Sequence, residues 1–248
     1  MSGHSRWSNI KHRKDAVDSR RGSQFTKMAK LIAVAAKKGG PYLDMNPALR
    51  MAVEKARSYN MAKDSIERAI KKGAGTGETA AYIELTYEGY AQGGVALLIE
   101  ALTDNRNRTT PEIRKIFEKG GGSLGEIGCV GWMFKRRGLM VLDAAGRNED
   151  DWMALVLEAG ADDLVVADGS VEVLTPPDSF EKVLGSLKKQ NLEPKSAQLT
   201  FTADTTVAVD AETARKVLSL MEAIDDHDDI QNVYTNMELP RELESQRE

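Results

Sequence analysis

The sequence lacks the features of an exported or membrane-embedded protein. Cys129 is its only cysteine, so the chain cannot form an internal disulfide bond, which fits a reducing compartment. The longest purely apolar run covers only 31–36, whereas a membrane-spanning helix needs about 20 residues. The first residues also lack the apolar core of a secretory signal. We therefore expect a cytoplasmic protein with no membrane partner.

Catalytic and cofactor-binding patterns are also scarce. The three histidines are widely separated, and no pair of side chains stands out as a general acid and general base. Residues 121–125 match the spacing of a nucleophile elbow, but the surrounding pattern places a helix before the serine and a strand after it, the reverse of that motif. Residues 73–77 are rich in glycine but lack the Gly-Lys-Ser/Thr ending of a phosphate loop. We expect no enzyme activity, no cofactor, no metal and no small-molecule substrate.

Charge is distributed very unevenly along the chain. The formal net charge is -4, but residues 1–75 contain 17 Lys and Arg against 6 Asp and Glu, a net charge of +11. The remaining residues hold the other 17 basic and 32 acidic side chains, a net charge of -15. A basic segment joined to an acidic body is typical of a module that binds a polyanion.

The basic segment is predicted to be helical. Apolar residues recur at helical spacing over 25–38, and two glycines end that helix. The Asn-Pro pair at 46–47 predicts the capped start of a second helix. Residues 64–67 have the form of a capping box for a third helix, which ends at Gly73. Residues 1–23 are polar and poorly periodic, and we expect a partly ordered arm there.

Beyond residue 80 the pattern changes to strands alternating with helices. We expect strands at 81–87, 94–102 and 130–134, with a helix at 110–119 between the last two. A second series follows, with a strand at 139–142, a helix at 149–159, strands at 163–167 and 170–175, a helix at 178–190 and a strand at 196–202. Its β-α-β-β-α-β order is that of the ferredoxin-like unit.

The final helix at 211–224 and strand at 230–236 are left without a sheet of their own. We assign them to the strands at 81–134, so that the ferredoxin-like unit is an insertion. The predicted fold class is α+β with several domains. The predicted division is a basic helical domain with its arm at 1–76, a discontinuous middle α+β domain at 77–136 plus 204–238, an inserted ferredoxin-like domain at 137–203, and a tail at 239–248.

The basic arm has the composition of a nucleic-acid-binding segment. Lys and Arg neutralise phosphates and release counterions, while a tryptophan among them can stack on an exposed base. The alternatives are a solvated charged surface that binds nothing, and a cationic patch for an acidic protein or a membrane surface. We predict nucleic-acid contacts by Arg6, Trp7, Lys11, His12, Arg13, Lys14, Arg20, Arg21, Lys27 and Lys30.

A second candidate contact lies just before the helix predicted at 110–119. Arg106 and Arg108 lie among amide and hydroxyl side chains, where the free backbone N–H groups of a helix start favour an anion. A plain capping loop explains the threonines there but not the arginines, because cations are unfavourable at that end of the helix dipole. We therefore add both arginines to the predicted nucleic-acid contacts. The basic triplet at 135–137 is instead predicted to be a solvated turn.

The densest acidic run is Asp-Asp-His-Asp-Asp at 225–229. Its carboxylates and imidazole could hold a divalent metal, but the spacing matches neither an EF-hand loop nor a zinc motif. An acidic turn between the last helix and the last strand is the simplest interpretation. The functional alternative is an acidic docking patch for a partner, formed by Asp225, Asp226, Asp228 and Asp229.

Six stretches together resemble the YebC/PmpR family, and the resemblance covers essentially the whole chain. They are 3–14 (GHSRWSNIKHRK), 25–27 (FTK), 46–50 (NPALR), 65–73 (SIERAIKKG), 103–109 (TDNRNRT) and 229–236 (DIQNVYTN). The resemblance implies an N-terminal helical domain and two α+β domains, with the ferredoxin-like one inserted. The chain departs from the pattern at Ala62, where proline is usual, and at Ser23, where a basic stretch is interrupted and one phosphate contact is weakened.

Members of that family are usually described as DNA-binding transcriptional regulators, so the resemblance implies this function. The family also includes the mitochondrial translational activator of cytochrome oxidase subunit I, and bacterial relatives are implicated in ribosome-associated translation. No helix-turn-helix signature sets side chains to read base edges, so the residues support phosphate binding better than sequence reading.

We expect a nucleic-acid-binding regulator of gene expression. A translation factor that binds ribosomal RNA at the ribosome is the alternative. A protein that binds its partner through the acidic run is a third hypothesis.

Overall fold

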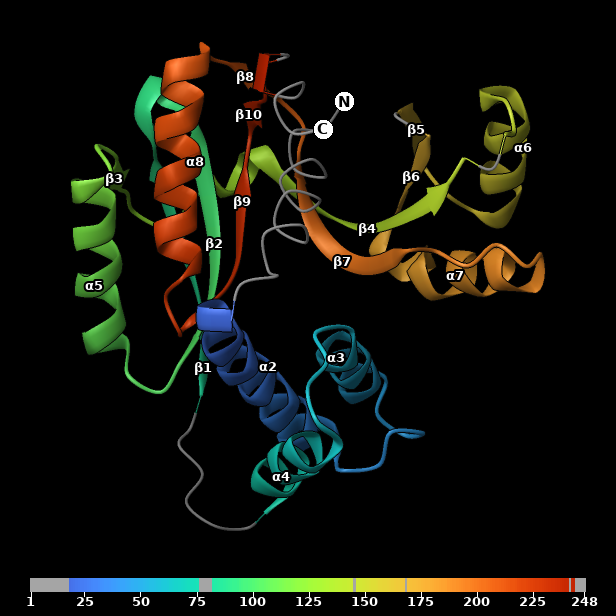
Figure 1. The fold of residues 1–248 in the computed structure, drawn as a ribbon, viewed down its shortest axis with the longest axis horizontal. Helices are drawn as coiled ribbons and strands as arrows, with labels where there is room; N and C mark the ends of the chain where they lie inside the picture. The colour runs from blue at the N-terminus through green and yellow to red at the C-terminus, as the bar shows by residue number, and fades with distance from the viewer. Residues whose placement is uncertain (1–17, 76–81, 145, 168, 241, 244–248) are drawn as a thin grey trace.

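The computed structural model describes residues 18–75, 82–144, 146–167, 169–240 and 242–243. They form one body of helices and two bodies that each combine helices with a sheet (Figure 1). None of the helices in these ranges combines the length and apolar character that crossing a membrane requires.

The helical domain consists of α2 (Asp18–Gly39), α3 (Pro47–Ser58) and α4 (Lys63–Ala74). The predicted start of α3 is confirmed, because Asn46 is its N-cap and accepts a hydrogen bond of 3.0 Å from the main-chain nitrogen of Leu49. The predicted capping box is wrong. The cap position of α4 is Ala62, which makes no side-chain cap hydrogen bond.

The three helices enclose an apolar core of their own. Ile32 of α2 and Leu49 of α3 are fully buried in it, and Ile66 of α4 completes it from the third side. All the residues of this core come from the helical domain. The domain therefore carries enough apolar contact to hold its own shape.

The first sheet has the strand order β3-β1-β2-β9, and all its pairs are antiparallel. Its strands are β1 (Ile83–Tyr90), β2 (Ala96–Thr103), β3 (Ser123–Leu124) and β9 (Ile230–Thr235). Helices α5 (Arg106–Lys119) and α8 (Ala211–Asp225) cover one face (Figure 1). The core on this face includes Phe117 of α5, Met221 of α8 and Ile99 of β2.

The second sheet has the order β5-β6-β4-β7, again with antiparallel pairs. Its elements are β4 (Phe134–Asp143), α6 (Glu149–Ala159), β5 (Asp163–Ala167), β6 (Ser170–Thr175), α7 (Phe180–Lys189) and β7 (Ser196–Ala203). This is the β-α-β-β-α-β order predicted from the sequence. Trp152 of α6 and Phe180 of α7 are buried against the sheet.

The two sheets meet where β4 begins and β7 ends. Phe134 of β4 is buried with Leu98 and Tyr234 on the face of the first sheet that α5 and α8 leave open. Both faces of β2 are thus covered, which explains why its sequence is apolar except for Glu100 and Thr103. The triplet at 135–137, predicted as a turn, lies in β4 because it pairs with residues 200–202 of β7.

Along the chain, β1, β2 and β3 precede the second sheet and β9 follows it. The first sheet therefore takes its strands from both sides of residues 134–203. A parallel pair of short strands, β8 (Val207–Ala208) and β10 (Met237–Glu238), lies near the end of the chain. Leu239 and Leu243, which we placed in a tail, are buried in the core beneath α8 and α5.

Candidate nucleic-acid interface

Most of the predicted arm contacts cannot be placed. Arg6, Trp7, Lys11, His12, Arg13 and Lys14 lie outside the described residues. The backbone of Arg20 and Arg21 belongs to the N-terminal part of α2. The contacts predicted for these eight residues stay predictions.

Lys27 lies in a position that sequence reasoning did not anticipate. Its side chain is only 1% exposed, although it is charged. The Nζ atom donates a hydrogen bond to the main-chain carbonyl of Asp225 and lies 3.6 Å from that residue's carboxylate. In this arrangement a phosphate cannot reach Lys27, so the contact predicted for it stays a prediction that requires this region to open. The partner of this cation is the chain itself.

Lys30, one helical turn further along α2, is held in the same way. Its Nζ lies 2.6 Å from Oδ1 of Asp229 and donates a hydrogen bond of 2.9 Å to the carbonyl of Asp228. Arg108 reaches the other oxygen of the same carboxylate, with Nη2 2.8 Å from Oδ2 of Asp229. Two of the predicted phosphate contacts therefore share one aspartate.

Asp229 is the centre of this cluster and is 2% exposed. The hydroxyl groups of Thr103 and Thr109 donate to its Oδ2 over 3.0 and 2.7 Å. Burial by itself raises the pKa of Asp229, but the hydrogen bonds from Lys30, Arg108 and Thr109 and the charge of Lys30 lower it more. The net effect places its pKa well below the usual value, so the carboxylate is ionised.

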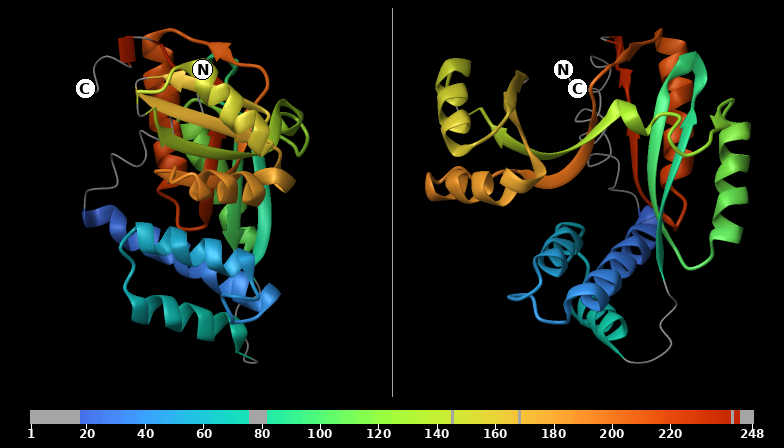
Figure 2. Two further views of the ribbon diagram at one scale, coloured as in Figure 1. Left: turned by 90° about the vertical axis from the view of Figure 1, so that its right-hand side faces the viewer. Right: turned by 180° about the vertical axis from the view of Figure 1, so that it is seen from behind.

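We call this cluster the charge clasp. It comprises Lys27, Lys30 and Arg108 with the side chains of Asp225 and Asp229 and the main-chain carbonyls of Asp225 and Asp228. Figures 1 and 2 show from several sides that the N-terminal half of α2 meets the loop between α8 and β9 here. The clasp therefore joins the helical domain to the first sheet.

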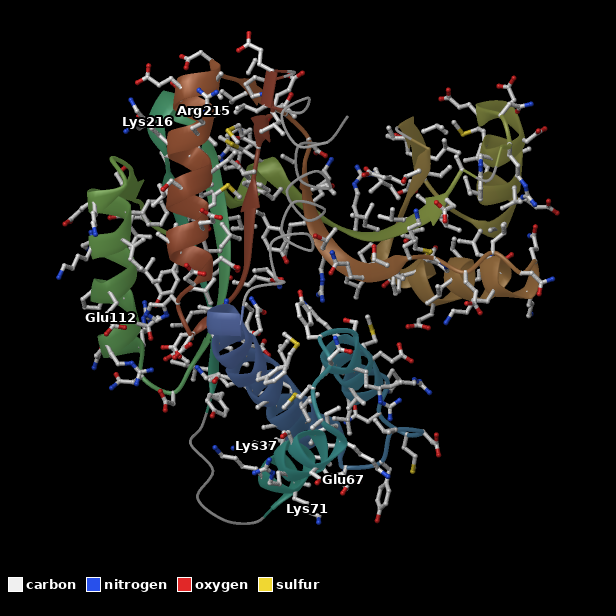
Figure 3. All side chains as sticks on the ribbon, in the orientation of Figure 1. Lys37, Glu67, Lys71, Glu112, Arg215 and Lys216 are labelled. Atoms are coloured by element: carbon white, nitrogen blue, oxygen red, sulfur yellow. The ribbon has the colours of Figure 1, made fainter. Side chains whose placement is uncertain are left out.

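His227 is tied into the same loop. Its Nδ1 accepts a hydrogen bond of 3.1 Å from the main-chain nitrogen of Asp229, and its Nε2 lies 2.9 Å from Oε2 of Glu112. This geometry assigns the proton to Nε2, because Nδ1 acts as an acceptor. Figure 3 labels Glu112 on α5, about halfway along that helix.

The acidic run therefore contacts another segment of the same chain, whereas the sequence predicted a docking patch for a separate partner. Asp225 and Asp229 bind the basic helix of the same chain, and Asp229 is too deeply buried for an external partner. The side chains of Asp226 and Asp228 are exposed. Among the described residues, no group of three His, Cys, Asp or Glu side chains is arranged to hold a metal ion.

Arg106 has a different environment from Arg108. Helix α5 begins at Arg106 rather than at residue 110, because Asn105 caps it and accepts a hydrogen bond of 3.2 Å from the nitrogen of Arg108. Arg106 lines an open depression of about 720 Å³ on the outer surface of α5, together with Arg114 and Lys115. These three cations are exposed and form no ion pair with another described residue.

Sequence reasoning missed Arg114 and Lys115, because two cations on a polar helix face are indistinguishable from an ordinary solvated surface. They share a helix face with Arg106 only because α5 begins at Arg106. The proline at 111 instead suggested a helix that begins at residue 110. We call Arg106, Arg114 and Lys115 the α5 strip. More exposed cations lie on the helical domain, where Figure 3 labels Lys37 on α2 and Lys71 on α4 at the end away from the clasp.

Comparison with known proteins covers nearly the whole chain. Residues 5–76 match the family model described as the TACO1/YebC protein N-terminal domain. Residues 82–237 match the model described as the TACO1/YebC second and third domain.

Curated relatives are similar over their full length. A protein of Halothermothrix orenii is 49% identical over 246 residues, which cover 98% of this chain and 97% of the relative. A protein of Maridesulfovibrio salexigens is 49% identical over 248 residues and 100% of both chains. Each is named a probable transcriptional regulatory protein.

A crystal structure of a conserved hypothetical protein from Aquifex aeolicus is also similar. It shares 42% sequence identity with this chain and has a TM-score of 0.80. The match covers 90% of this chain and 92% of that one.

Proposed function

Because this chain belongs to the TACO1/YebC family, whose curated relatives are named probable transcriptional regulatory proteins, we propose that it is a nucleic-acid-binding regulator of gene expression and not an enzyme. The observation that carries this proposal is the net charge of +11 on residues 1–75, joined to a body of -15. Such a segment is drawn to the phosphate backbone whatever its sequence.

The mechanism we propose is electrostatic. Cations of residues 1–75 neutralise phosphates and release counterions, while the α5 strip offers a second set of cations on the middle domain that form no ion pair with another described residue. The sequence has no helix-turn-helix signature that sets side chains to read base edges, so we propose that binding depends on the phosphate backbone more than on base sequence. We propose DNA as the target, in line with the names of the relatives.

The second candidate is a translation factor that binds ribosomal RNA. The observation that favours it is Trp7, which lies within the most basic stretch of the chain. An aromatic ring among cations suits unpaired bases, which RNA loops expose and duplex DNA does not. Ultraviolet crosslinking in cells followed by sequencing of the bound nucleic acid separates the two. Discrete promoter fragments support the first candidate, and ribosomal or transfer RNA supports the second.

A binding assay tests the electrostatic mechanism on the full-length protein. We expect the triple variant Lys11→Gln, Arg13→Gln, Lys14→Gln to bind both DNA and RNA about tenfold more weakly or worse at 0.1 M salt. A matched control removes three exposed lysines from α7, with Lys182→Gln, Lys188→Gln and Lys189→Gln. If both variants lose affinity equally, only the overall charge matters and the arm has no special role.

The salt dependence is a second check. Six phosphate contacts on duplex DNA give a plot of log K against log salt a slope of about -5. A flat plot for the wild-type protein contradicts electrostatic binding altogether.

A further inference from the structure

We propose that the charge clasp is an autoinhibitory contact, in which Asp225 and Asp229 occupy cations that nucleic-acid phosphates take over when the clasp opens. This inference rests on the proposed function and adds a regulation of the same site. In the closed state Lys27 and Lys30 hold the helical domain against the first sheet. In the open state Lys30 and Arg108 no longer contact Asp229, and phosphates take its place.

The first support is the separateness of the helical domain. Its core contains residues of α2, α3, α4 and the connections between them, with no contribution from either sheet. Of its apolar residues, Met51 packs against the core of the second sheet and is only partly buried. The domain can therefore move away from the sheets without losing its own core.

The second support is the polar nature of the joint. At the N-terminal half of α2 the clasp contributes ion pairs and hydrogen bonds, and near the other end of the helix Lys38 pairs with Glu84 of β1 at 2.5 Å. Both partners of that second pair are about two-thirds exposed, so the pair contributes little. Opening the clasp returns its charges to water, and the regained hydration offsets part of the lost attraction. A joint of this kind can be opened by a competing anion.

The third support is the match between carboxylate and phosphate. Both are anions whose oxygens accept charge-assisted hydrogen bonds from Lys and Arg. Arg108 presents a planar guanidinium, a group suited to either anion. It also lies in the first turn of α5, where the helix dipole disfavours a cation, and its carboxylate partners among the described residues, Asp104 and Asp229, offset this. Asp229 thus occupies the place that a phosphate would take.

Closed and open states give a quantitative expectation. If only a small fraction of the protein is open, the apparent dissociation constant for nucleic acid is raised by the inverse of that fraction. Weakening the clasp then tightens binding without any new contact. A purely structural ion pair predicts the opposite, because its loss can only loosen the protein.

The test compares Asp229→Asn with Asp228→Asn in the full-length protein. Each variant removes one negative charge, and the two positions are adjacent. Asp228 contributes only its main-chain carbonyl to the clasp, which the substitution keeps. The probes are a 20-nucleotide single strand and a 20-base-pair duplex, and binding is measured at one fixed salt concentration.

We expect Asp229→Asn to lower the dissociation constant about tenfold, as for an open fraction near one tenth, and Asp228→Asn to change it less than twofold. Equal gains in the two variants assign the effect to net charge and overturn the clasp. Unchanged or weaker binding by a folded Asp229→Asn protein also overturns it. If neither the wild-type protein nor any variant binds either probe, the proposed function itself is wrong.

A second measurement does not depend on the stability of that variant. Fluorescent labels are attached at Lys37→Cys on α2 and Arg215→Cys on α8 in a Cys129→Ser background, with the clasp intact. Figure 3 shows these two positions on the helical domain and on the middle domain. We expect saturating oligonucleotide to lower energy transfer between the labels. Unchanged transfer at saturation means that the clasp stays closed during binding and contradicts the inference.

Discussion

The carboxylate of Glu88 lies 2.6 Å from the main-chain nitrogen of Gly131 and accepts its hydrogen bond. It also accepts main-chain hydrogen bonds from Gly128 and Val130, over 2.8 and 2.7 Å. Glu88 is buried on β1. Its carboxylate satisfies three main-chain N–H groups of the connection between β3 and β4 that would otherwise lack an acceptor. That connection is therefore held in one conformation.

We expect Glu88→Gln to lower the free energy of unfolding by about 1–3 kcal/mol at pH 7. An amide has one acceptor oxygen where the carboxylate has two, and its NH2 group faces donors rather than acceptors. Denaturant unfolding measures the change. Glu126→Gln, an exposed residue of the same connection, is the control and should change stability by less than about 0.5 kcal/mol. Equal effects in the two variants would show that the three hydrogen bonds contribute nothing.

A second prediction concerns the packing of α2 on α4. Gly73 of α4 lies so close to α2 that a Cβ atom there would be 2.1 Å from the carbonyl oxygen of Ala33. The helices must separate to accept it, so we expect Gly73→Ala to destabilise the helical domain by about 1–3 kcal/mol. Circular dichroism of thermal unfolding measures the change.

Gly185→Ala is the matched control for that variant. Gly185 lies within α7, and a Cβ atom there meets nothing within 4 Å. Alanine loses less conformational freedom than glycine in a helix, so this variant should be more stable by about 0.5–1 kcal/mol. Destabilisation by both substitutions would mean that close helix packing is not the cause.

A third prediction concerns the α5 strip. We expect the triple variant Arg106→Gln, Arg114→Gln, Lys115→Gln to bind duplex DNA about tenfold more weakly, if the strip contacts phosphates as proposed. The slope of log K against log salt should become shallower by about 2–3, since each lost contact contributes about 0.9. The triple lysine variant of α7 described above is again the charge-matched control. A slope equal to that of the wild-type protein excludes the strip from the interface.

The local features of the fold follow from the sequence more readily than the contacts between distant segments. The Asn-Pro pair at 46–47 predicts the start of α3, and the Oδ1 atom of Asn46 caps that helix. The Nδ2 atom of the same residue donates to the carbonyls of Ala35 and Gly40, each over 2.8 Å. No spacing rule foretells that second role, because it depends on how α2 ends beside α3.

The same limit applies to the candidate site. Charge patterning assigns Lys27, Lys30 and Arg108 to an external polyanion, whereas in the structure each contacts an acidic residue of the same chain. Their partners lie 198, 199 and 121 residues away in the sequence, so only the folded chain brings the opposite charges together. Asp229 looks like any other member of an acidic turn until its burial is known.

The last prediction is that the clasp weakens in acid. The folded-state pKa of Asp229 is far below the value of about 3.9 for an unfolded aspartate. A carboxylate of this kind stabilises the folded state fully above the unfolded pKa, and this stabilisation is lost as the pH falls toward the folded pKa. The difference in unfolding free energy between the wild-type protein and Asp229→Asn should therefore be constant from pH 7 to about 5 and shrink below pH 4. Urea unfolding at pH 7, 5, 4 and 3 measures it. The side chain of Asp228 is exposed, so the corresponding difference for Asp228→Asn should not change with pH in this way. If the difference in unfolding free energy for Asp229→Asn stays constant down to pH 3, the charge of Asp229 does not stabilise the closed state.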